Sequence, residues 1–268
     1  MSEADPIPEG AVVREVDGGW HDRLVREEPL LIRVRDQSVL TMRTPGRDED
    51  LAIGFLLTEG VLRDVDEVEG IETEAGDADE LRADAVTVAV RNPAAARIEG
   101  RLTRTHEIRS SCGICGLVDA DELLEDTPPL LSGVPRLEQK RIPKLLKTFS
   151  ARQKLFAATG ACHGAAIFDA AGDVLGFAED VGRHNALDKA IGEAARAGAD
   201  LPRSIAMLSG RAGFDLVLKC LRVRIPCIVS VSAASALSHD LCASAGATLV
   251  GFARGTDCTV YVDGNRID

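Results

Sequence analysis

The sequence of 268 residues lacks any apolar run long enough to cross a bilayer. Residues 1–10 are acidic and polar and contain two prolines, so they lack the apolar core of a signal peptide. The sequence also lacks the pattern of a disulfide framework, because its cysteines number seven, which is odd, and are thinly spread. With 45% hydrophobic residues, we expect a cytoplasmic globular protein with no membrane partner. Its thiols are then expected to serve catalysis, redox chemistry or metal binding.

A basic surface suited to nucleic acid is also lacking, since the net charge is −12. The acidity is concentrated in residues 1–80, which hold 22 acidic and 8 basic side chains. Residues 136–154, by contrast, contain seven Lys/Arg and one Glu, a pattern that also fits a solvated helix face. Arg183, Arg211 and Arg254 each lie near glycines in loop-like stretches. The second part of the chain is therefore expected to accept an anionic ligand.

The first part, residues 1–110, is expected to form a small α+β domain with about ten flexible residues at its start. Asp48 is placed to cap a helix that runs through Thr58, with Gly60 past its end. β-Branched and alternating patterns predict strands or hairpins at residues 30–44, 65–73 and 85–90. Residues 111–135 then form a loop and a proline-containing linker.

The last part, residues 136–268, alternates short apolar strands with helices. Residues 137–149 look helical except at Pro143, and a turn at residues 169–173 indicates a hairpin. Strands and helices alternating at this spacing predict a three-layer α/β/α domain whose ligand site lies at the strand ends. Strands are expected at residues 162–168, 174–178, 204–208, 227–231 and 248–253, and helices at residues 186–194, 214–221 and 235–245.

A pair of thiols, Cys112 and Cys115, lies in the stretch Ser111-Cys112-Gly113-Ile114-Cys115-Gly116. Flanking glycines let the backbone turn and approach a partner closely, which favours a reactive loop. Basic neighbours or a helix start lower a thiol pKa in such pairs. His106 and Arg109 are candidate cationic neighbours, and residues 117–124 read as a short helix with Asp119 as a cap. Half a zinc site or a chance pair remains an alternative.

Three loops at predicted strand ends carry site-like residues. Residues 179–185 combine two acids, a glycine, Arg183, His184 and an amide just before a helix. Ser209, Gly210 and Arg211 follow a strand and open a helix, where backbone N–H groups receive phosphate. Residues 252–257 supply an aromatic ring, a cation and a donor-rich turn: Phe252, Ala253, Arg254, Gly255, Thr256 and Asp257. Each loop alone is commonly only a helix cap, but together they suit a nucleotide-containing anion.

These motifs, in this order, resemble the formate dehydrogenase accessory sulfurtransferase family (FdhD) from about residue 30 to the end. The resemblance implies a homodimer whose second domain has a cytidine-deaminase-like fold. It also implies that Cys112 receives persulfide sulfur from a cysteine desulfurase. The sulfur then passes to the molybdenum bis(molybdopterin guanine dinucleotide) cofactor before the cofactor enters formate dehydrogenase. Residues 252–257 correspond to the family's cofactor-binding segment.

Other functions fit the same residues less well. A zinc deaminase is disfavoured, because His163-Gly164-Ala165 lacks the required Glu and Pro226-Cys227 lacks the second Cys. Zinc at Cys112 and Cys115 would need two further ligands, which Cys162 and His163 would supply only by a coincidence of folding, so no intrinsic metal is expected. A thiol-disulfide oxidoreductase fits less well, because residues 104–111 lack the buried strand of a thioredoxin-like fold. A non-catalytic cofactor chaperone stays open and would keep its activity without Cys112.

The inferred mechanism is a sulfur relay, in which Cys115 attacks, passes on or resolves the persulfide on Cys112. We expect residues 107–116 to be mobile without a partner. In the cofactor site, Phe252 is expected near a guanine, Arg254 at a phosphate and Gly255 where the backbone approaches, with residues 209–211 lining the same pocket. The other cysteines are predicted to be small buried hydrophobes: Cys162, Cys220, Cys227, Cys242 and Cys258.

Overall fold

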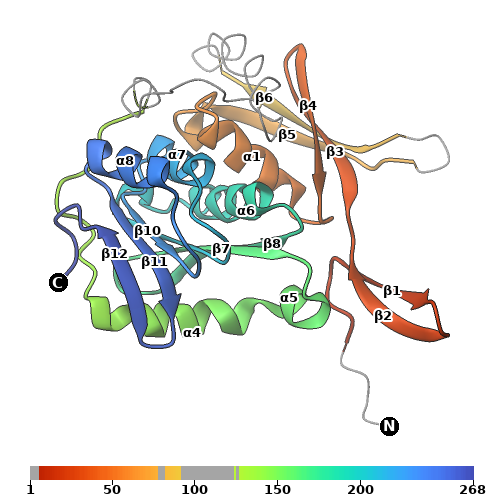
Figure 1. Ribbon diagram of the computed structural model, residues 1–268. Coiled ribbons are helices and arrows are strands. Elements are labelled where there is room, and N and C mark those ends of the chain that lie inside the picture. Colours follow the sequence, from red (N-terminus) through yellow and green to blue (C-terminus); the bar gives the residue numbers. More distant parts are fainter. Residues whose placement is uncertain (1–5, 78–81, 92–123, 125–126) are drawn as a thin grey trace.

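The computed structural model describes residues 6–77, 82–91, 124 and 127–268. Within them, a six-stranded sheet has helix α4 on one face and helices α6, α7 and α8 on the other (Figure 1). The predicted mixed α/β fold, with helices covering both faces of a sheet in the last part, is confirmed. A four-stranded sheet lies beyond helix α1, and a two-stranded hairpin projects from the body.

The six-stranded sheet has the order β12-β11-β10-β9-β7-β8. Strands β9, β10 and β11 are parallel, so their carboxyl ends lie at one edge of the sheet. Strand β7 is antiparallel to β9 and pairs with β8. Its amino end and the carboxyl end of β8 therefore lie at that same edge. The strands are β7 (His163–Phe168), β8 (Val174–Asp180), β9 (Ile205–Leu208), β10 (Cys227–Ser230), β11 (Thr248–Arg254) and β12 (Asp257–Val262).

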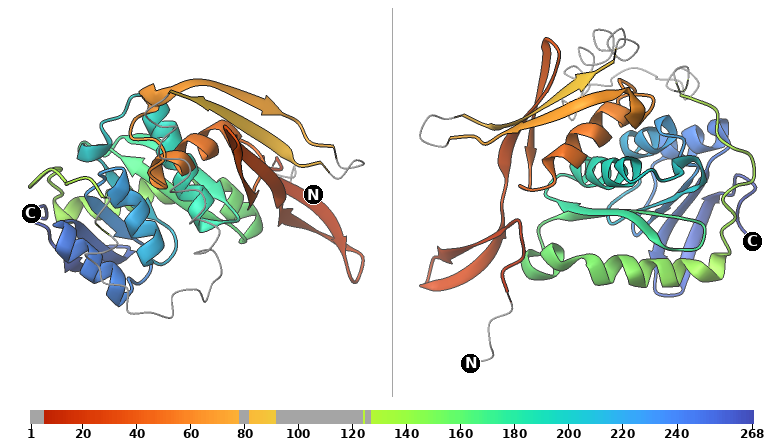
Figure 2. Two further views of the ribbon diagram at one scale, coloured as in Figure 1. Left: turned by 90° about the horizontal axis from the view of Figure 1, so that it is seen from above. Right: turned by 180° about the vertical axis from the view of Figure 1, so that it is seen from behind.

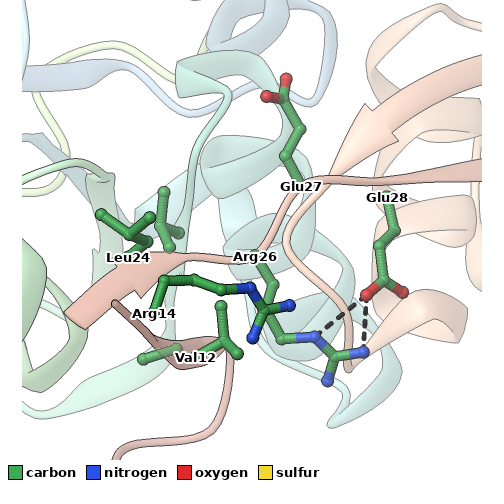
Figure 3. A pocket seen from close by; sticks show the side chains of 8 residues that line it. Val12, Arg14, Leu24, Arg26, Glu27 and Glu28 are labelled. Carbon is green, nitrogen blue, oxygen red and sulfur yellow. Dashed lines mark hydrogen bonds and ion pairs between the residues drawn. The ribbon is translucent and has the colours of Figure 1, made fainter. Parts of the chain in front are cut away.

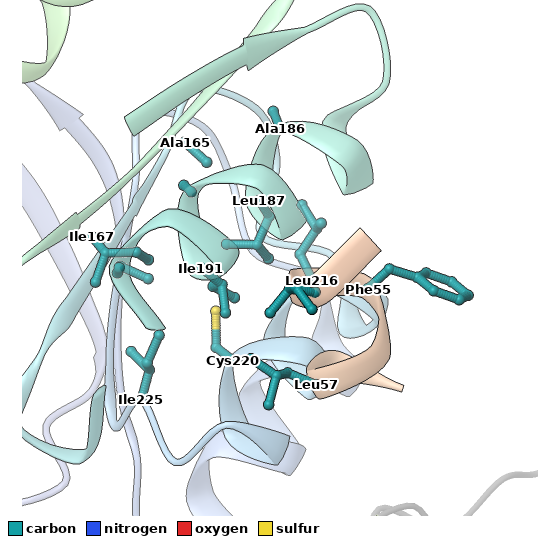
Figure 4. Packing of buried hydrophobic residues seen from close by; sticks show 14 of the residues in the cluster. Phe55, Leu57, Ala165, Ile167, Ala186, Leu187, Ile191, Leu216, Cys220 and Ile225 are labelled. Carbon is teal, nitrogen blue, oxygen red and sulfur yellow. The ribbon is translucent and has the colours of Figure 1, made fainter. Parts of the chain in front are cut away.

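Side chains alternate between the two faces of this sheet, as the pleat of a strand requires. Ala166 and Phe168 of β7 pack with α4, whereas Ala165 and Ile167 pack with the helices of the opposite face. Figure 4 shows Ala165 and Ile167 of β7 in one hydrophobic cluster with Leu187 and Ile191 of α6. The helices are α4 (Ile142–Arg152), α5 (Lys154–Thr159), α6 (Arg183–Arg196), α7 (Phe214–Arg222) and α8 (Ala236–Ala245), with a 3-10 turn at Leu201–Arg203.

The four-stranded sheet belongs to the first part and has the order β4-β3-β6-β5. Helix α1 (Asp48–Thr58) packs between this sheet and α6, so every residue from Leu51 to Thr58 is buried. One hydrophobic cluster runs from Leu30 through Leu56 to Leu187, which joins the two parts in a single core. The strands are β3 (Glu28–Val34), β4 (Gln37–Arg43), β5 (Val68–Glu74) and β6 (Asp84–Val90).

Helices α1 and α6 touch through their backbones at two glycines. A Cβ atom added to Gly54 would lie 1.8 Å from the carbonyl oxygen of Asp188. One added to Gly192 would lie 1.9 Å from the carbonyl oxygen of Asp50. Only glycine fits such an approach, so these two residues set the spacing of the helices.

Three local predictions are corrected. Asp48 is not the cap of α1: Arg47 occupies that position, and the Asp48 carboxylate accepts two hydrogen bonds of 2.9 Å from Arg43. Arg43 is 1% exposed and needs carboxylate partners, which overrides the local preference for capping. Strand β5 begins three residues later than predicted, after a 3-10 turn at Val65–Glu67. Helix α4 begins at Ile142 after a 3-10 turn at Gln139–Arg141 and holds Pro143 in its first turn.

Three elements were not predicted: the hairpin of β1 (Ala11–Val16) and β2 (Trp20–Val25), helix α5, and strand β12. The hairpin projects from the body in both views of Figure 2. A hollow of about 520 Å³ lies at its base, between Arg14 and Glu28, where Arg26 donates to Glu28 (Figure 3). None of the helices that the structure describes is long and apolar enough to cross a membrane.

Candidate functional site

Several loops meet where the parallel strands end. Ser209 follows β9 and is held against β7, since its backbone N–H donates to the Gly164 carbonyl at 3.0 Å and its Oγ accepts from the Gly164 N–H at 2.9 Å. The Ser230 hydroxyl donates to the Gly210 carbonyl at 2.6 Å. The Phe252 N–H donates to the Ser232 carbonyl at 3.0 Å. We call this set the strand-end edge: His163 and residues 180–184, 209–215, 231–235 and 252–254.

The turn between β8 and α6 is anchored by a buried ion pair. Asp180 is 0% exposed and Lys189 is 2% exposed, and their charged atoms are 2.8 Å apart. Asp180 also accepts from the backbone N–H of Thr44 at 3.1 Å and of Gly182 at 2.8 Å, while Lys189 donates to the Thr44 carbonyl at 2.7 Å. A buried pair with its hydrogen bonds satisfied specifies one arrangement of the turn. This network presents Arg183 and His184 at the edge.

Arg183 and His184 both contact Asp215, the second residue of helix α7. The Arg183 guanidinium lies 2.9 Å from the Asp215 carboxylate, and His184 Nε2 is hydrogen-bonded to the same oxygen. Partial burial disfavours the charged carboxylate, but the hydrogen bond and charge of His184 and the charge of Arg183 outweigh it and lower the pKa of Asp215. Asp215 was not singled out in the sequence, although an acid two residues past the turn of residues 209–213 was a usable signal.

Phe252 and Arg254 form a second feature of the edge. The Phe252 side chain is 40% exposed, and the Arg254 guanidinium carbon lies 5.6 Å from its ring centroid. Arg254 Nε also donates to the Val231 carbonyl at 3.1 Å. Phe252 has a φ of 49°, a left-handed conformation that costs a non-glycine residue about 1–2 kcal/mol. An aromatic face beside a cation is suited to a planar base and a phosphate.

The other residues predicted for the cofactor site differ in their exposure and position. Ala253 is 0% exposed and packs in the core under α4, so its side chain does not face a ligand. Gly255 and Thr256 form an exposed turn, with open space around the Gly255 Cα and a φ of 56°. Asp257 begins strand β12 and lies opposite Arg254 of β11 in the register of the sheet. Arg211 is exposed beside Gly210 in the loop after β9.

Cys112, Cys115 and the predicted mobile loop of residues 107–116 lie outside the described residues, as do His106 and Arg109. The prediction of burial is confirmed for four of the other cysteines: Cys162, Cys220, Cys227 and Cys242. Cys258 is half-buried.

Burial suppresses the reactivity of these buried thiols. It raises the pKa of Cys227 and of Cys242 to about 12, which leaves almost no thiolate at neutral pH. Burial and the neighbouring Glu179 raise the pKa of Cys162 as well. In the part of the chain that the structure describes, no three His, Cys, Asp or Glu side chains are arranged to hold a metal ion.

The six-stranded sheet makes the chain an open α/β protein, a class whose ligands bind beyond the carboxyl ends of the strands. The model of the FdhD/NarQ family matches residues 25–268, and the chain belongs to that family. The resemblance inferred from the motifs is thereby confirmed.

Individual relatives agree over nearly the whole length. The chain is 41% identical to the sulfur carrier protein FdhD of Streptomyces avermitilis, over 96% of this chain and 94% of that protein. It is 40% identical to the sulfur carrier protein FdhD of Anaeromyxobacter dehalogenans, over 98% and 94%. The fold resembles that of a candidate formate dehydrogenase accessory protein from Desulfotalea psychrophila, with a TM-score of 0.72 and 26% identity over 96% of this chain and 97% of that one.

Proposed function

We propose that this protein is a sulfurtransferase that carries persulfide sulfur on Cys112. A cysteine desulfurase supplies the sulfur, and the acceptor is the molybdenum bis(molybdopterin guanine dinucleotide) cofactor that formate dehydrogenase requires. The observation that carries the proposal is 41% identity, over nearly the full length, with a protein named as a sulfur carrier. The protein acts in the cytoplasm as a homodimer.

The chemistry suits the Cys112-Gly113-Ile114-Cys115 sequence. Transfer from the desulfurase converts the Cys112 thiolate into a persulfide whose outer sulfur is ready to leave. Attack of the Cys115 thiolate on the inner sulfur forms a Cys112–Cys115 disulfide and releases the outer sulfur as hydrosulfide. The two cysteines supply both electrons, so this step needs no other reductant. The disulfide must be reduced before the next cycle.

The strand-end edge is the proposed site of the substrate cofactor. A guanine is expected to stack on Phe252, and the phosphates to meet Arg254, Arg183 and His184 together with the backbone N–H groups of Gly210 and Arg211. The exposed ring of Phe252, held beside Arg254, supports this arrangement. The molybdenum belongs to the substrate, and its chemistry is supplied by the cofactor.

Mass spectrometry tests the sulfur-transfer step. After incubation with an active cysteine desulfurase and cysteine, the peptide that holds Cys112 should gain the mass of one sulfur atom. Cys112→Ser is the matched variant and should gain none at that position, while Cys115→Ser should still be loaded. An unmodified Cys112 peptide would contradict the proposal.

Activation of formate dehydrogenase separates the rival functions. A sulfurtransferase loses this activity with Cys112→Ser, whereas an inert chaperone of the cofactor keeps it. A thiol-disulfide oxidoreductase would reduce a disulfide substrate without ever gaining sulfur.

A further inference from the structure

We propose that Asp215 is a positioning residue of the strand-end edge, which holds Arg183 and His184 so that their remaining polar atoms meet phosphate groups. The inference rests on the proposed function, because the phosphates are those of the guanine-containing substrate. It assigns Asp215 a role in binding without placing it against the ligand.

The geometry joins two elements through one carboxylate. Asp215 lies at the start of α7, while Arg183 and His184 are the first two residues of α6. One oxygen of Asp215 takes both partners, with Arg183 Nη2 at 2.9 Å and His184 Nε2 in a short hydrogen bond. The other oxygen accepts the Leu216 N–H at 3.0 Å. All three hydrogen bonds that the carboxylate accepts in this arrangement come from the protein.

The loop before α7 is shaped to leave room for this carboxylate. A Cβ atom on Gly213 would lie 2.5 Å from Asp215 Oδ1, closer than real Cβ contacts allow. Any larger residue at position 213 would therefore displace the Asp215 side chain. Gly213 is the N-cap of α7 and has an extended conformation, with a φ of −76°, so space explains the glycine there better than backbone strain does.

The ionised carboxylate of Asp215 defines which nitrogen of His184 faces it. An ionised carboxylate only accepts hydrogen bonds, so His184 Nε2 must carry the hydrogen that faces Asp215. His184 Nδ1 is then left for another partner. His163 approaches from β7, and burial together with the charges of Arg183 and His184 lowers its pKa. Asp180, whose charge also acts on His163, is paired with buried Lys189.

Arg183 retains donors for a ligand. Among the residues that the structure describes, Asp215 is its one ion-pair partner, and the contact uses Nη2 alone. Fixing one nitrogen of a planar guanidinium also fixes the direction of the others, which reduces the entropy lost when a phosphate binds. This is the physical advantage that Asp215 would provide.

Two explanations of the role of Asp215 predict opposite changes in the affinity for GDP when Asp215→Asn is made. If the carboxylate acts only through its charge, removing it should tighten binding of an anion. If it positions Arg183 and His184, the amide should weaken binding, because a neutral acceptor holds the two donors less tightly than a carboxylate does. We expect GDP affinity to fall about tenfold in isothermal calorimetry of the full chain. Affinity for guanosine, which lacks phosphates, should not change.

Matched variants isolate the effect. Asp200→Asn removes an equal charge from an exposed Asp–Arg pair at the amino end of β9, the opposite edge of the sheet, and should leave GDP affinity unchanged. Gly213→Ala displaces the Asp215 side chain without changing the charge and should reproduce the loss. It also serves if Asp215→Asn fails to fold. In an Arg183→Ala, His184→Ala background, Asp215→Asn should cause no further loss, because its partners are gone.

Each other outcome overturns the inference. GDP binding that is unchanged or tighter with Asp215→Asn would show that the carboxylate does not position its partners. An equal loss for GDP and guanosine would indicate a general structural role. A wild-type protein that binds neither GDP nor pyrophosphate would overturn both this inference and the proposed cofactor site. Sulfur loading of Cys112 is measured separately, so it shows whether the sulfur-transfer step stands in any of these cases.

Discussion

Gly192→Ala tests the close crossing of helices α1 and α6. The added methyl carbon would lie 1.9 Å from the carbonyl oxygen of Asp50, whereas ordinary contacts begin near 3.4 Å. The atoms that this methyl carbon would meet all belong to the backbone of α1, so no side chain can move aside. The two helix backbones must therefore separate. Separation also strains polar contacts across the crossing, including the hydrogen bond of 2.8 Å between Thr58 and Asp188.

Two opposing effects set the size of the change. Alanine is favoured over glycine within a helix by about 1 kcal/mol. Overpacking a core usually costs about 1–3 kcal/mol, and a backbone clash belongs at the upper end of that range. We therefore expect Gly192→Ala to lower the free energy of unfolding by about 2 kcal/mol, which lowers the melting temperature by roughly 4–8 °C in a chain of this size.

Thermal and urea denaturation of the full chain, followed by circular dichroism, measure this change. Gly70→Ala is the matched control, because nothing lies within 4 Å of its added Cβ atom and no positive φ is involved. Gly54→Ala should behave like Gly192→Ala, since its Cβ atom meets the Asp188 carbonyl at 1.8 Å. A Gly192→Ala protein as stable as the wild type would refute the assigned crossing of α1 and α6.

Three further predictions concern charged side chains. Arg254→Ala should weaken GDP binding about tenfold to a hundredfold by calorimetry while sulfur loading of Cys112 stays intact; unchanged affinity would place the pocket elsewhere. Lys219→Met should destabilise the protein by about 3–5 kcal/mol in urea, because it leaves buried Asp188 without the partner at 2.9 Å, and adding Asp188→Leu should recover part of the loss. Asp215 has a lowered pKa in the folded protein, so its ionisation stabilises the fold above its ordinary pKa near 3.9, and this contribution is lost as pH falls further. The stability difference between wild type and Asp215→Asn should therefore be constant above about pH 5 and shrink as pH falls below about 4, and a difference that stays constant at acid pH would contradict the shift.

The central strands could be predicted because each is a short, continuous apolar run between turn residues. Ile205–Leu208 and Cys227–Ser230 are buried at every position, as strands covered on both faces must be. The hairpin of β1 and β2 offered no such run, because its side chains are exposed or half-buried. Gly18 and Gly19, both with positive φ, were the available signal for its turn.

Helix α1 illustrates how tertiary contacts override local rules. Asp48 has the residue type and position of an N-cap, but buried Arg43 takes its carboxylate. The helix also lacks an apolar stripe, because it is buried between a sheet and α6 on all sides from Leu51 onward. The bounds of α1, Asp48–Thr58, were nevertheless predicted correctly, because the signals that begin and end a helix are local.

The composition of the strand-end edge was predictable, but its pairings were not. Arg183, His184, Arg211 and Arg254 were expected at strand ends, and the structure places them there. The partner of Arg183 and His184 depends on how α6 and α7 cross the sheet, and that crossing brings Asp215 within 2.9 Å of Arg183 from 32 residues away. A contact between residues so far apart along the chain leaves no local pattern in the sequence.

The strand-end edge depends on the first part of the chain as well as on the six-stranded sheet. Thr44, which follows β4, supplies a backbone N–H to Asp180, a carbonyl to Lys189 and a hydroxyl to the Val181 N–H at 3.0 Å. Without Thr44, the buried Asp180–Lys189 pair would keep its charges but lose part of the hydrogen bonding that makes burial tolerable. The turn that carries Arg183 and His184 is thus held by contacts from both parts of the chain. The division at residues 111–135 marks a break along the sequence, whereas the core and this polar network are continuous across it.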